Sequence, residues 1–306
     1  MPGKIISVIN FKGGVGKTTL SVNLAACLAQ EYQKKTLLVD LDPQSNASIW
    51  LLTEGKWKEK NTRAHALKTA WSLFTNKFSF DNCLRPFDSP LSGHNIRKLA
   101  LLPASFHMIE LESEIFRAQI KQQVDGKYRN GNEYRYLAKM RKLLGERFDY
   151  VVIDCPPNLY NVTKNALFHS DFIIIPCIPN ALSSMGLKLL LHHLEKIVLP
   201  FEPEMQVAPL VLGVVISRYN STLKDHSLGI KAIKSAFREF KEESPKALIV
   251  NDRTAVFQDY PIRDYISHSE AVQHNLPLCL YQEMSKAYAD VKANTQALVE
   301  AMEGLS

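Results

Sequence analysis

The chain has 306 residues, of which 46% are hydrophobic and 22% charged, and its formal net charge is +6. This is the composition of an ordinary globular protein with enough apolar mass for one large core, and no segment reaches the ~18 consecutive apolar residues of a membrane span. The small basic excess permits a polyanionic partner such as nucleic acid without requiring one.

Five cysteines are scattered along the chain, and no two of them form a C-x-x-C pair. An odd, scattered set argues against a disulfide framework and against a zinc site, so we expect a cytosolic protein. The first residues run directly into a strand-like segment, which predicts neither a signal peptide nor a separate N-terminal DNA-binding module. The cysteines are Cys27, Cys83, Cys155, Cys177 and Cys279.

Short runs rich in Ile and Val alternate with longer segments of helical spacing. Each run has the length of a strand that is buried on both faces. Leucines at helical spacing follow the first run at Leu20, Leu24 and Leu28. The alternation predicts an α/β fold with a mostly parallel twisted sheet and helices on both faces. The predicted strands are Ile5–Ile9, Thr36–Val39, Leu99–Leu102, Tyr150–Ile153, Phe172–Ile175, Leu210–Ile216 and Leu248–Val250.

Two segments interrupt this alternation. Residues 53–97 are polar and rich in aromatic residues, with one predicted helix around Arg63–Phe74, and we expect an insertion or lid near the ligand edge. Residues 125–133 are predicted to form an exposed loop. No internal repeat or low-complexity linker divides the chain, so residues 1–306 are predicted to form a single domain.

The segment Gln282–Met302 repeats apolar residues at the spacing of a helix that covers the core. Its three acidic residues are accompanied by only two basic ones, Lys286 and Lys292. A helix that lies on a membrane surface should carry a basic polar face, so we expect no membrane association.

The strongest pattern is the segment Asn10–Thr19, N-F-K-G-G-V-G-K-T-T, between a predicted strand and a predicted helix. Glycines let backbone N–H groups converge on phosphate oxygens, and the following helix directs its positive end at the same anion. In this interpretation Lys17 neutralises the β- and γ-phosphates of a nucleotide, Thr18 coordinates Mg²⁺ and Thr19 contacts the α-phosphate. The alternative is a glycine-rich turn with incidental lysines, which the flanking strand and helix disfavour. The predicted nucleotide-binding residues of the loop are Lys12, Gly13, Gly14, Val15, Gly16, Lys17, Thr18 and Thr19.

The loop departs from the common pattern G-x-x-x-x-G-K-[ST], because Phe11 occupies the first glycine position and a second lysine, Lys12, follows it. The string K-G-G-V-G-K-T-T resembles the ParA/MinD family of deviant Walker A ATPases, most of all ParA-type partition ATPases without an N-terminal DNA-binding domain. The resemblance implies a single P-loop ATPase domain that uses ATP and Mg²⁺. It also implies that Lys12 reaches across a nucleotide-sandwich homodimer to the partner's phosphates, so ATP is expected to drive dimerisation.

Two aspartates that are two residues apart, Asp40 and Asp42, follow the second predicted strand. The side chains of such a pair point to the same side of the strand, at the edge where open α/β sheets bind ligands. The resemblance implies that Asp40 supports Mg²⁺ and that Asp42 orients or activates the attacking water, as a carboxylate near a γ-phosphate can do. The alternative is a pair of turn-forming aspartates before Pro43. The expected catalytic residues are therefore Lys12, Lys17 and Asp42.

A third aspartate, Asp154, ends the hydrophobic run Tyr150–Ile153. A hydrophobic strand that ends in aspartate is the Walker B arrangement, in which the carboxylate holds Mg²⁺ through water. The metal site is thus predicted to contain Thr18, Asp40 and Asp154.

Adenine recognition in the family uses residues that follow the last core strands, and two places in this chain meet that description. One is Ser217 with Arg218, and the other is the segment Asn251–Arg253. Family members usually carry Pro-Arg near the second place, whereas this chain has Asn-Asp-Arg. The candidates for contact with the nucleotide there are Arg218, Asn251 and Arg253.

A helix predicted from about Asp225 to Lys241 carries a basic stripe beside its apolar one. Lys231, Lys234 and Arg238 share the basic stripe, and ParA-like proteins bind DNA non-specifically through basic residues in their C-terminal half. Such a stripe suits sequence-independent contact with phosphates. The alternative is a solvated helix face without a partner.

Together these features predict a slow, partner-stimulated ATP hydrolase that dimerises with ATP, coats nucleoid DNA in the cytoplasm and positions a plasmid, a chromosome or an organelle. An adaptor protein on the cargo is expected to stimulate hydrolysis. A MinD-like membrane-associated regulator of the division site is one alternative, but it needs a basic amphipathic C-terminal tail. An iron–sulfur ATPase of the nitrogenase-reductase kind needs cysteines that bridge two subunits, and a biosynthetic ligase needs a substrate pocket that the sequence does not reveal.

Overall fold

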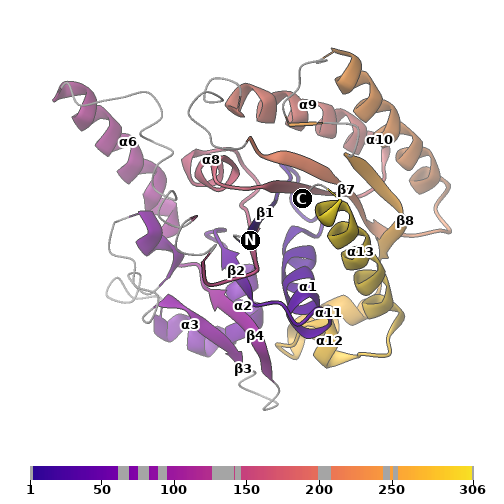
Figure 1. Ribbon diagram of the computed structural model, residues 1–306, viewed down its shortest axis with the longest axis horizontal. Coiled ribbons are helices and arrows are strands. Elements are labelled where there is room, and N and C mark those ends of the chain that lie inside the picture. Colours follow the sequence, from indigo (N-terminus) through magenta and orange to yellow (C-terminus); the bar gives the residue numbers. More distant parts are fainter. Residues whose placement is uncertain are drawn as a thin grey trace.

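The computed structural model describes residues 3–60, 69–74, 83–88, 95–125, 141, 146–198, 208–243, 249–250 and 254–304. At its centre, the described strands form an eight-stranded sheet in the order β3-β4-β2-β5-β1-β6-β7-β8 (Figure 1). Within this sheet β3 is antiparallel to β4 and the other neighbours are parallel, which confirms the predicted α/β fold. The strands are β1 (Lys4–Val8), β2 (Thr36–Asp40), β3 (Arg85–Asp88), β4 (Asn95–Leu102), β5 (Tyr150–Asp154), β6 (Phe172–Cys177), β7 (Leu210–Tyr219) and β8 (Ala255–Arg263).

Helices cover both faces of the sheet, because successive side chains of a buried strand point to opposite faces. In β1, Ile5 belongs to one cluster of buried residues and Ile6 to the other. The first cluster joins the sheet to α6, α8, α9 and α10, and the second joins it to α1, α2, α11, α12 and α13. The helices are α1 (Lys17–Gln30), α2 (Asn46–Leu52), α3 (Glu54–Lys60), the 3₁₀ helix η1 (Ala70–Phe74), α6 (Met108–Val124), α8 (Asn161–Phe168), α9 (Ala181–Val198), α10 (Lys224–Glu243), α11 (Ile266–Gln273), α12 (Leu278–Tyr281) and α13 (Lys286–Glu303).

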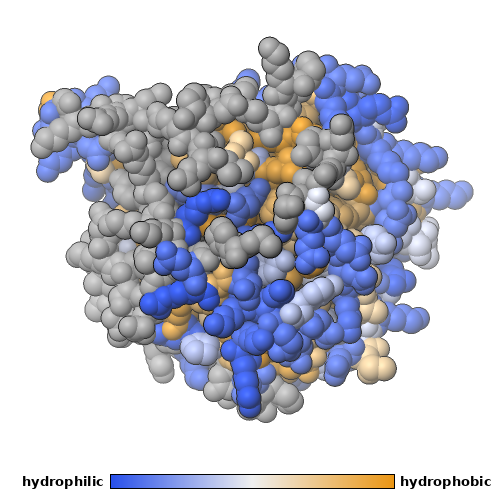
Figure 2. Space-filling model, in the orientation of Figure 1, coloured by the Kyte–Doolittle hydropathy of each residue, from blue (hydrophilic) through white to orange (hydrophobic). Residues whose placement is uncertain are grey.

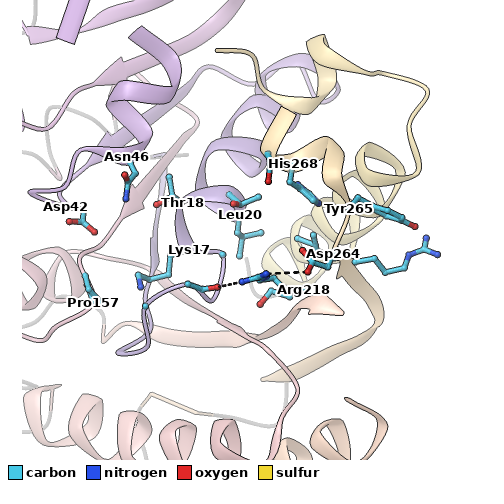
Figure 3. Close-up of a pocket in the computed structure, with 18 of the residues that line it drawn as sticks. Lys17, Thr18, Leu20, Asp42, Asn46, Pro157, Arg218, Asp264, Tyr265 and His268 are labelled. Carbon is cyan, nitrogen blue, oxygen red and sulfur yellow. Dashed lines mark hydrogen bonds and ion pairs between the residues drawn. The ribbon is translucent and has the colours of Figure 1, made fainter. Parts of the chain in front are cut away.

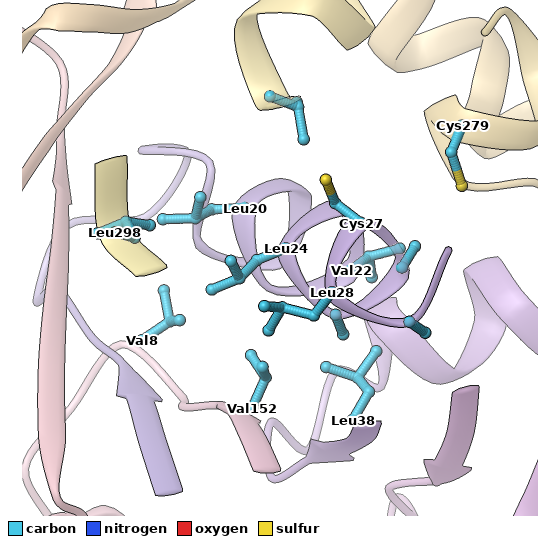
Figure 4. Packing of buried hydrophobic residues seen from close by; sticks show 14 of the residues in the cluster. Val8, Leu20, Val22, Leu24, Cys27, Leu28, Leu38, Val152, Cys279 and Leu298 are labelled. Atoms are coloured by element: carbon cyan, nitrogen blue, oxygen red, sulfur yellow. The ribbon is translucent and has the colours of Figure 1, made fainter. Parts of the chain in front are cut away.

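Helix α1 is held against the centre of the sheet by the predicted leucine stripe. Leu20, Leu24 and Leu28 are buried, and below them lie Val8 of β1 and Val152 of β5 (Figure 4). Burial of each leucine stabilises the fold by about 1.5–3 kcal/mol. The packing therefore keeps the N-terminal end of α1 at the carboxyl ends of the central strands.

Six of the seven predicted strands are present, and most of them extend beyond the predicted ends. The prediction of a strand at Leu248–Val250 is wrong for the two residues of it that the structure describes, since Ile249 and Val250 lie outside any strand. The carbonyl oxygen of Ile249 accepts a hydrogen bond from the N–H of Val211 at 2.7 Å. Both side chains are buried, so the apolar run reflects packing and not strand pairing.

The two edge strands, β3 and β8, do not follow from the apolar pattern. Strand β8 lies at one end of the sheet and exposes polar residues near its middle, such as Asp259 and Tyr260. Strand β3 has four residues, and one of them, Pro86, has no N–H for the ladder. Proline is tolerated at an edge because one side of an edge strand has no neighbour.

Within the predicted insertion at residues 53–97, the described residues form α3, η1, β3 and the first part of β4. The predicted helix Arg63–Phe74 lies outside the described residues as far as residue 68, and its end is η1. The N–H of Ala70 donates to the carbonyl oxygen of Pro103 at 2.8 Å, so η1 packs beside the carboxyl end of β4. The predicted loop 125–133 lies outside the described residues after Asp125.

The predicted C-terminal helix is α13. Ser285 caps its first turn, because the Ser285 hydroxyl accepts a hydrogen bond from the N–H of Tyr288 at 3.1 Å. Leu298 and Met302 are buried against the sheet, as the apolar spacing predicts. Among the described helices, none is both long enough and apolar enough to cross a membrane.

The packing of α10 near the carboxyl end of β6 depends on Gly229. A Cβ at this position would lie 2.2 Å from the carbonyl oxygen of Pro179 and 2.7 Å from the backbone nitrogen of Asn180. Because backbone atoms cannot move aside as a flexible side chain can, Gly229→Ala is expected to lower the free energy of unfolding by about 1–3 kcal/mol.

Denaturant unfolding measures this loss, and Gly186→Ala in α9 is the matched control. A Cβ at Gly186 meets no atom within 4 Å. That substitution is therefore expected to leave stability unchanged or to raise it by about 0.4–1 kcal/mol. Equal stability of the two variants would contradict the close approach of α10 to Pro179.

Candidate functional site

The segment Asn10–Thr19 consists of a loop after β1 and the first three residues of α1, and the shape of the loop depends on two glycines. Gly14 and Gly16 have φ angles of 72° and 81°, in the left-handed region that residues with a Cβ rarely adopt. Gly16 precedes the first turn of α1, and no side chain caps that turn. The first N–H groups of the helix are therefore available to an anion, which is the geometry that a phosphate needs.

Lys17 opens α1, and only 8% of it is exposed. Its ammonium donates to the carbonyl oxygen of Lys12 at 3.0 Å, so the side chain lies along the loop. Burial lowers the pKa of Lys17, while the carboxylates of Asp154 and Asp42 act in the opposite direction. The loop thus holds a poorly solvated cation, for which a phosphate is a favourable partner.

Parallel pairing of β2 with β5 places Asp40 opposite Asp154 at the carboxyl edge of the sheet. Asp154 is buried, and its Oδ1 accepts a hydrogen bond from the Ser21 hydroxyl at 3.0 Å. Its Oδ2 is shielded from solvent and has no hydrogen-bond partner in the described part of the chain. Burial raises the pKa of Asp154 to about 6, although hydrogen bonds from Thr18 and Ser21 act to lower this pKa. An unpaired carboxylate oxygen near a threonine hydroxyl fits a Mg²⁺ ion that carries water ligands.

Asp40 is also buried, but both of its oxygens are occupied. Oδ1 accepts from the N–H of Asp42 at 3.1 Å, and Oδ2 accepts from the Ser48 N–H at 2.9 Å and from the Ser48 hydroxyl at 2.6 Å. Burial, together with the Asp154 carboxylate, raises the pKa of Asp40 to about 8. Asp40 therefore holds the turn at Asp42 and the start of α2 from behind the site.

A cavity of about 430 Å³ runs from the loop past the start of α1 to the end of β8. Its volume is within the roughly 300–1,000 Å³ of small-molecule sites. One end contains Lys17, Thr18 and Asp42, and the other is lined by the segment Ile262–Ser269 (Figure 3). The two ends differ in chemistry, because only the first end contains the glycine-rich loop and Lys17. The cavity is lined by Gly13, Gly14, Gly16, Lys17, Thr18, Thr19, Leu20, Asp42, Gln44, Asn46, Pro157, Ser217, Arg218, Ile262, Arg263, Asp264, Tyr265, His268 and Ser269.

Arg218 connects the two ends of the cavity. Its guanidinium donates to the carbonyl oxygen of Gly14 at 3.4 Å and to Oδ2 of Asp264 at 3.3 Å (Figure 3). Its φ of 50° is uncommon for a residue with a Cβ, and such conformations occur often at functional sites. The neighbouring Ser217 donates from its hydroxyl to the carbonyl oxygen of Val15 at 2.8 Å. The sequence candidates Ser217 and Arg218 therefore both lie at the cavity.

The sequence did not predict that the segment Ile262–Ser269 lines the site, and the segment Asn251–Arg253 was the candidate instead. Those three residues lie outside the described part of the chain. Arg263 anchors the segment, because its Nε and one terminal nitrogen donate to the Asp290 carboxylate of α13 at 2.8 and 2.5 Å.

Lys12 is half-buried and does not line the cavity. Its backbone N–H donates to Oδ1 of Asn10 at 3.0 Å, which fixes the start of the loop. Its ammonium donates to Oδ1 of Asn180, just before α9, at 3.5 Å. In the single chain the Lys12 side chain thus lies against Asn180 and outside the lining of the cavity.

Helix α10 covers the predicted span and extends it by one residue at the N-terminal end and two at the C-terminal end. Lys231, Lys234 and Arg238 are exposed on it, whereas Ile233 and Phe237 are buried in the core. Hydrophilic side chains cover the edge of the molecule where α10 lies (Figure 2). The three basic side chains are therefore accessible to a large anionic partner.

All five cysteines are buried, and none of them forms a disulfide. Among the described residues, no group of three His, Cys, Asp or Glu side chains is placed to hold a metal ion. A metal at the cavity would therefore take part of its ligands from elsewhere, such as nucleotide phosphates and water.

Comparison with known proteins identifies relatives of this chain. The AAA domain family matches residues 3–207. The sporulation initiation inhibitor protein Soj of Bacillus subtilis is 29% identical over 93% of this chain and 93% of its own length. The chromosome partitioning protein ParA of Myxococcus xanthus is 33% identical over 71% of this chain and 67% of its own.

Solved structures share the fold over nearly the whole length. Apo McdA of Cyanothece has a TM-score of 0.70 at 21% identity, covering 98% of this chain and 99% of its own. Cobyrinic acid a,c-diamide synthase of Mycobacterium smegmatis, with a bound ATP analog and magnesium, has a TM-score of 0.68 at 21% identity, covering 99% and 97%. One fold thus serves proteins with different names, so function must be argued from the site.

Proposed function

The chain belongs to the ParA/MinD family of deviant Walker A ATPases, and from this membership we propose that it is an ATP-driven switch that positions a large cargo on DNA. The observation that carries the proposal is the cavity in which the loop Asn10–Thr19 meets Asp42, with Asp154 behind them. ATP closes two copies into a dimer, the dimer binds DNA, and hydrolysis separates the copies again.

The loop end of the cavity binds the triphosphate. Backbone N–H groups from Gly13 to Thr19 and the Lys17 ammonium donate to phosphate oxygens. Thr18 and Asp154 would hold Mg²⁺, for which Oδ2 of Asp154 is unpaired, and Asp40 supports them from behind the site. When bound, the metal ion neutralises phosphate charge.

Hydrolysis depends on Asp42, which lines the cavity beside the loop. One of its oxygens, Oδ1, accepts a hydrogen bond from the N–H of Gln44 at 2.9 Å, which orients the carboxylate. Asp42 then accepts a hydrogen bond from the attacking water and aligns it with the γ-phosphate. The basal reaction is slow, and an adaptor protein on the cargo stimulates it.

The dimer forms through the face that carries Lys12. The first turns of helix α9, just beyond Asn180, expose the apolar side chains of Leu182 at 71% and Met185 at 69%. Apolar area beside a nucleotide site supports contact with a second copy, since its burial is favourable. Lys12 leaves Asn180 and reaches the other copy's γ-phosphate. ATP therefore promotes dimerisation, whereas ADP, which lacks this phosphate, does not.

DNA binds to α10 through Lys231, Lys234 and Arg238. Such contacts are made to phosphates, so they are independent of sequence and weaken steeply with salt. A dimer presents two stripes, and the gain in avidity makes binding depend on ATP. The protein is then nucleoid-associated in the cytoplasm.

Reversal of the stripe tests the proposal. The variant Lys231→Glu/Lys234→Glu/Arg238→Glu is expected to lose at least about a hundredfold in DNA affinity, because it replaces phosphate contacts with repulsion. Its basal ATP hydrolysis should stay near the parent's, since the stripe is exposed and does not line the cavity. DNA retention at two salt concentrations, with ATP and with ADP, measures the effect.

The matched control is Lys34→Glu/Lys35→Glu/Arg97→Glu, which changes the net charge equally at exposed positions near the other edge of the sheet. It should retain most of the DNA affinity. Equal losses in both triple variants would mean that net charge, and not the stripe, governs binding. A parent that binds no DNA with ATP at low salt would contradict the DNA-carrier function itself.

The names of the relatives favour DNA as the load, since one is a chromosome partitioning protein. We therefore place plasmid or chromosome segregation ahead of organelle positioning. A MinD-like function at a membrane is not favoured, because the polar face of α13 carries acidic residues such as Glu300 and Glu303. The iron–sulfur alternative is not favoured either, because the five cysteines are buried.

A further inference from the structure

We infer that His268 contacts the nucleoside part of the bound nucleotide and contributes to its selection, an inference that rests on the proposed nucleotide-binding function. His268 belongs to α11 and to the segment Ile262–Ser269, which lines the end of the cavity opposite Lys17 and Asp42 (Figure 3). If the loop holds the triphosphate, the far end of the cavity remains for the ribose and the base.

The polar atoms of His268 are unused in the free protein. Both ring nitrogens are shielded from solvent, and neither makes a hydrogen bond of normal geometry with a described residue. Burial lowers the pKa of His268, although the Arg263 backbone and the carboxylates of Asp264 and Asp290 act in the opposite direction. The ring is therefore mainly neutral near pH 7, with one N–H donor and one acceptor free.

A histidine that only supported the fold would be expected to pair these nitrogens, because unpaired buried polar groups are destabilising. The charged residues of the same wall are already engaged, Arg218 with Asp264 and Arg263 with Asp290. His268 lines the cavity, and contact with a ligand requires a rotation about its side-chain bonds that turns a ring nitrogen into the cavity. Ribose hydroxyls and purine bases offer both donors and acceptors to such a group.

The other end of the same helix supplies a matched control, His274. It follows α11, is exposed, and stacks on Tyr281 with ring centroids 4.9 Å apart. It does not line the cavity. A His→Phe substitution at this position keeps the ring contact and leaves the cavity unchanged.

Ligand binding to His268→Phe, His268→Gln and His274→Phe tests the inference. His268→Phe is expected to weaken ATP binding about tenfold, the equivalent of one hydrogen bond. Its affinity for inorganic tripolyphosphate with Mg²⁺, which probes the phosphate end alone, should equal the parent's. Without nucleotide, it should melt at the same or a higher temperature, because two unpaired nitrogens are gone. His268→Gln, which keeps a donor and an acceptor, should retain most of the ATP affinity, and His274→Phe should match the parent throughout.

Parent-like ATP affinity in His268→Phe would overturn the inference. So would equal losses for ATP and tripolyphosphate, because the ring would then support the loop and not the nucleoside. If the parent binds neither ligand, the proposed nucleotide-binding function fails first, and that failure is distinct from the others.

Discussion

Replacing Lys17 with alanine is expected to weaken ATP binding by at least about a hundredfold, which abolishes it at micromolar concentrations. The ammonium is buried between the loop and two carboxylates, so it meets the phosphates in a poorly solvated place. Hydrogen bonds to charged groups contribute about 1.5–3 kcal/mol each, and 1.4 kcal/mol corresponds to a factor of ten. Removing the ammonium also leaves Asp42 and Asp154 to repel the nucleotide. Equilibrium binding of a fluorescent ATP analogue measures the loss.

The control for this change is Lys34→Ala, at an exposed lysine before β2. It removes the same charge from the chain far from the loop and should bind ATP as the parent does. Thermal unfolding without nucleotide shows whether Lys17→Ala remains folded. A folded Lys17→Ala variant with parent-like affinity would contradict the assignment of the loop as the phosphate site.

Replacing Asp42 with alanine is expected to separate binding from hydrolysis. A positioned general base contributes about 10²–10⁴-fold to a rate, so turnover should fall at least about a hundredfold. ATP affinity should remain within a few-fold of the parent's, because Asp42 makes no attractive contact with the phosphates. Phosphate release measures turnover, and the same fluorescent analogue measures affinity.

Asp259→Ala removes an exposed carboxylate from β8, away from the loop, and should leave both quantities unchanged. Asp42→Ala with parent-like turnover would remove Asp42 from the mechanism. Joint loss of ATP binding and turnover would instead give Asp42 a part in holding the nucleotide.

The central strands could be predicted because they are buried on both faces and therefore consist of unbroken apolar residues. The same rule fails at the edges of the sheet. There Asp259 and Tyr260 of β8 face solvent, and Pro86 of β3 lacks an N–H for pairing with a neighbouring strand. It also misleads at Ile249 and Val250, since burial in the core makes a segment apolar without making it a strand.

The Lys17 end of the cavity could be predicted because its loop, strand and helix are consecutive in the chain. The opposite end depends on contacts between distant segments, such as that between Arg263 and Asp290, and no local spacing encodes them. Sequence spacing also leaves Asp40 and Asp154 equivalent. Their difference appears only in the fold, where Ser48 occupies Oδ2 of Asp40 while Oδ2 of Asp154 has no described partner.

The switch itself is tested most directly by the mass of the protein in solution, measured by light scattering with ATP, with ADP and without nucleotide. The parent and Asp42→Ala are expected to be monomeric with ADP, and Asp42→Ala should accumulate as a dimer with ATP because hydrolysis no longer resets it. Lys12→Ala should bind ATP yet stay monomeric, since it lacks the ammonium that reaches the other copy's phosphate. An Asp42→Ala variant that binds ATP but remains monomeric, or a Lys12→Ala variant that dimerises as readily, would contradict an ATP-driven dimer.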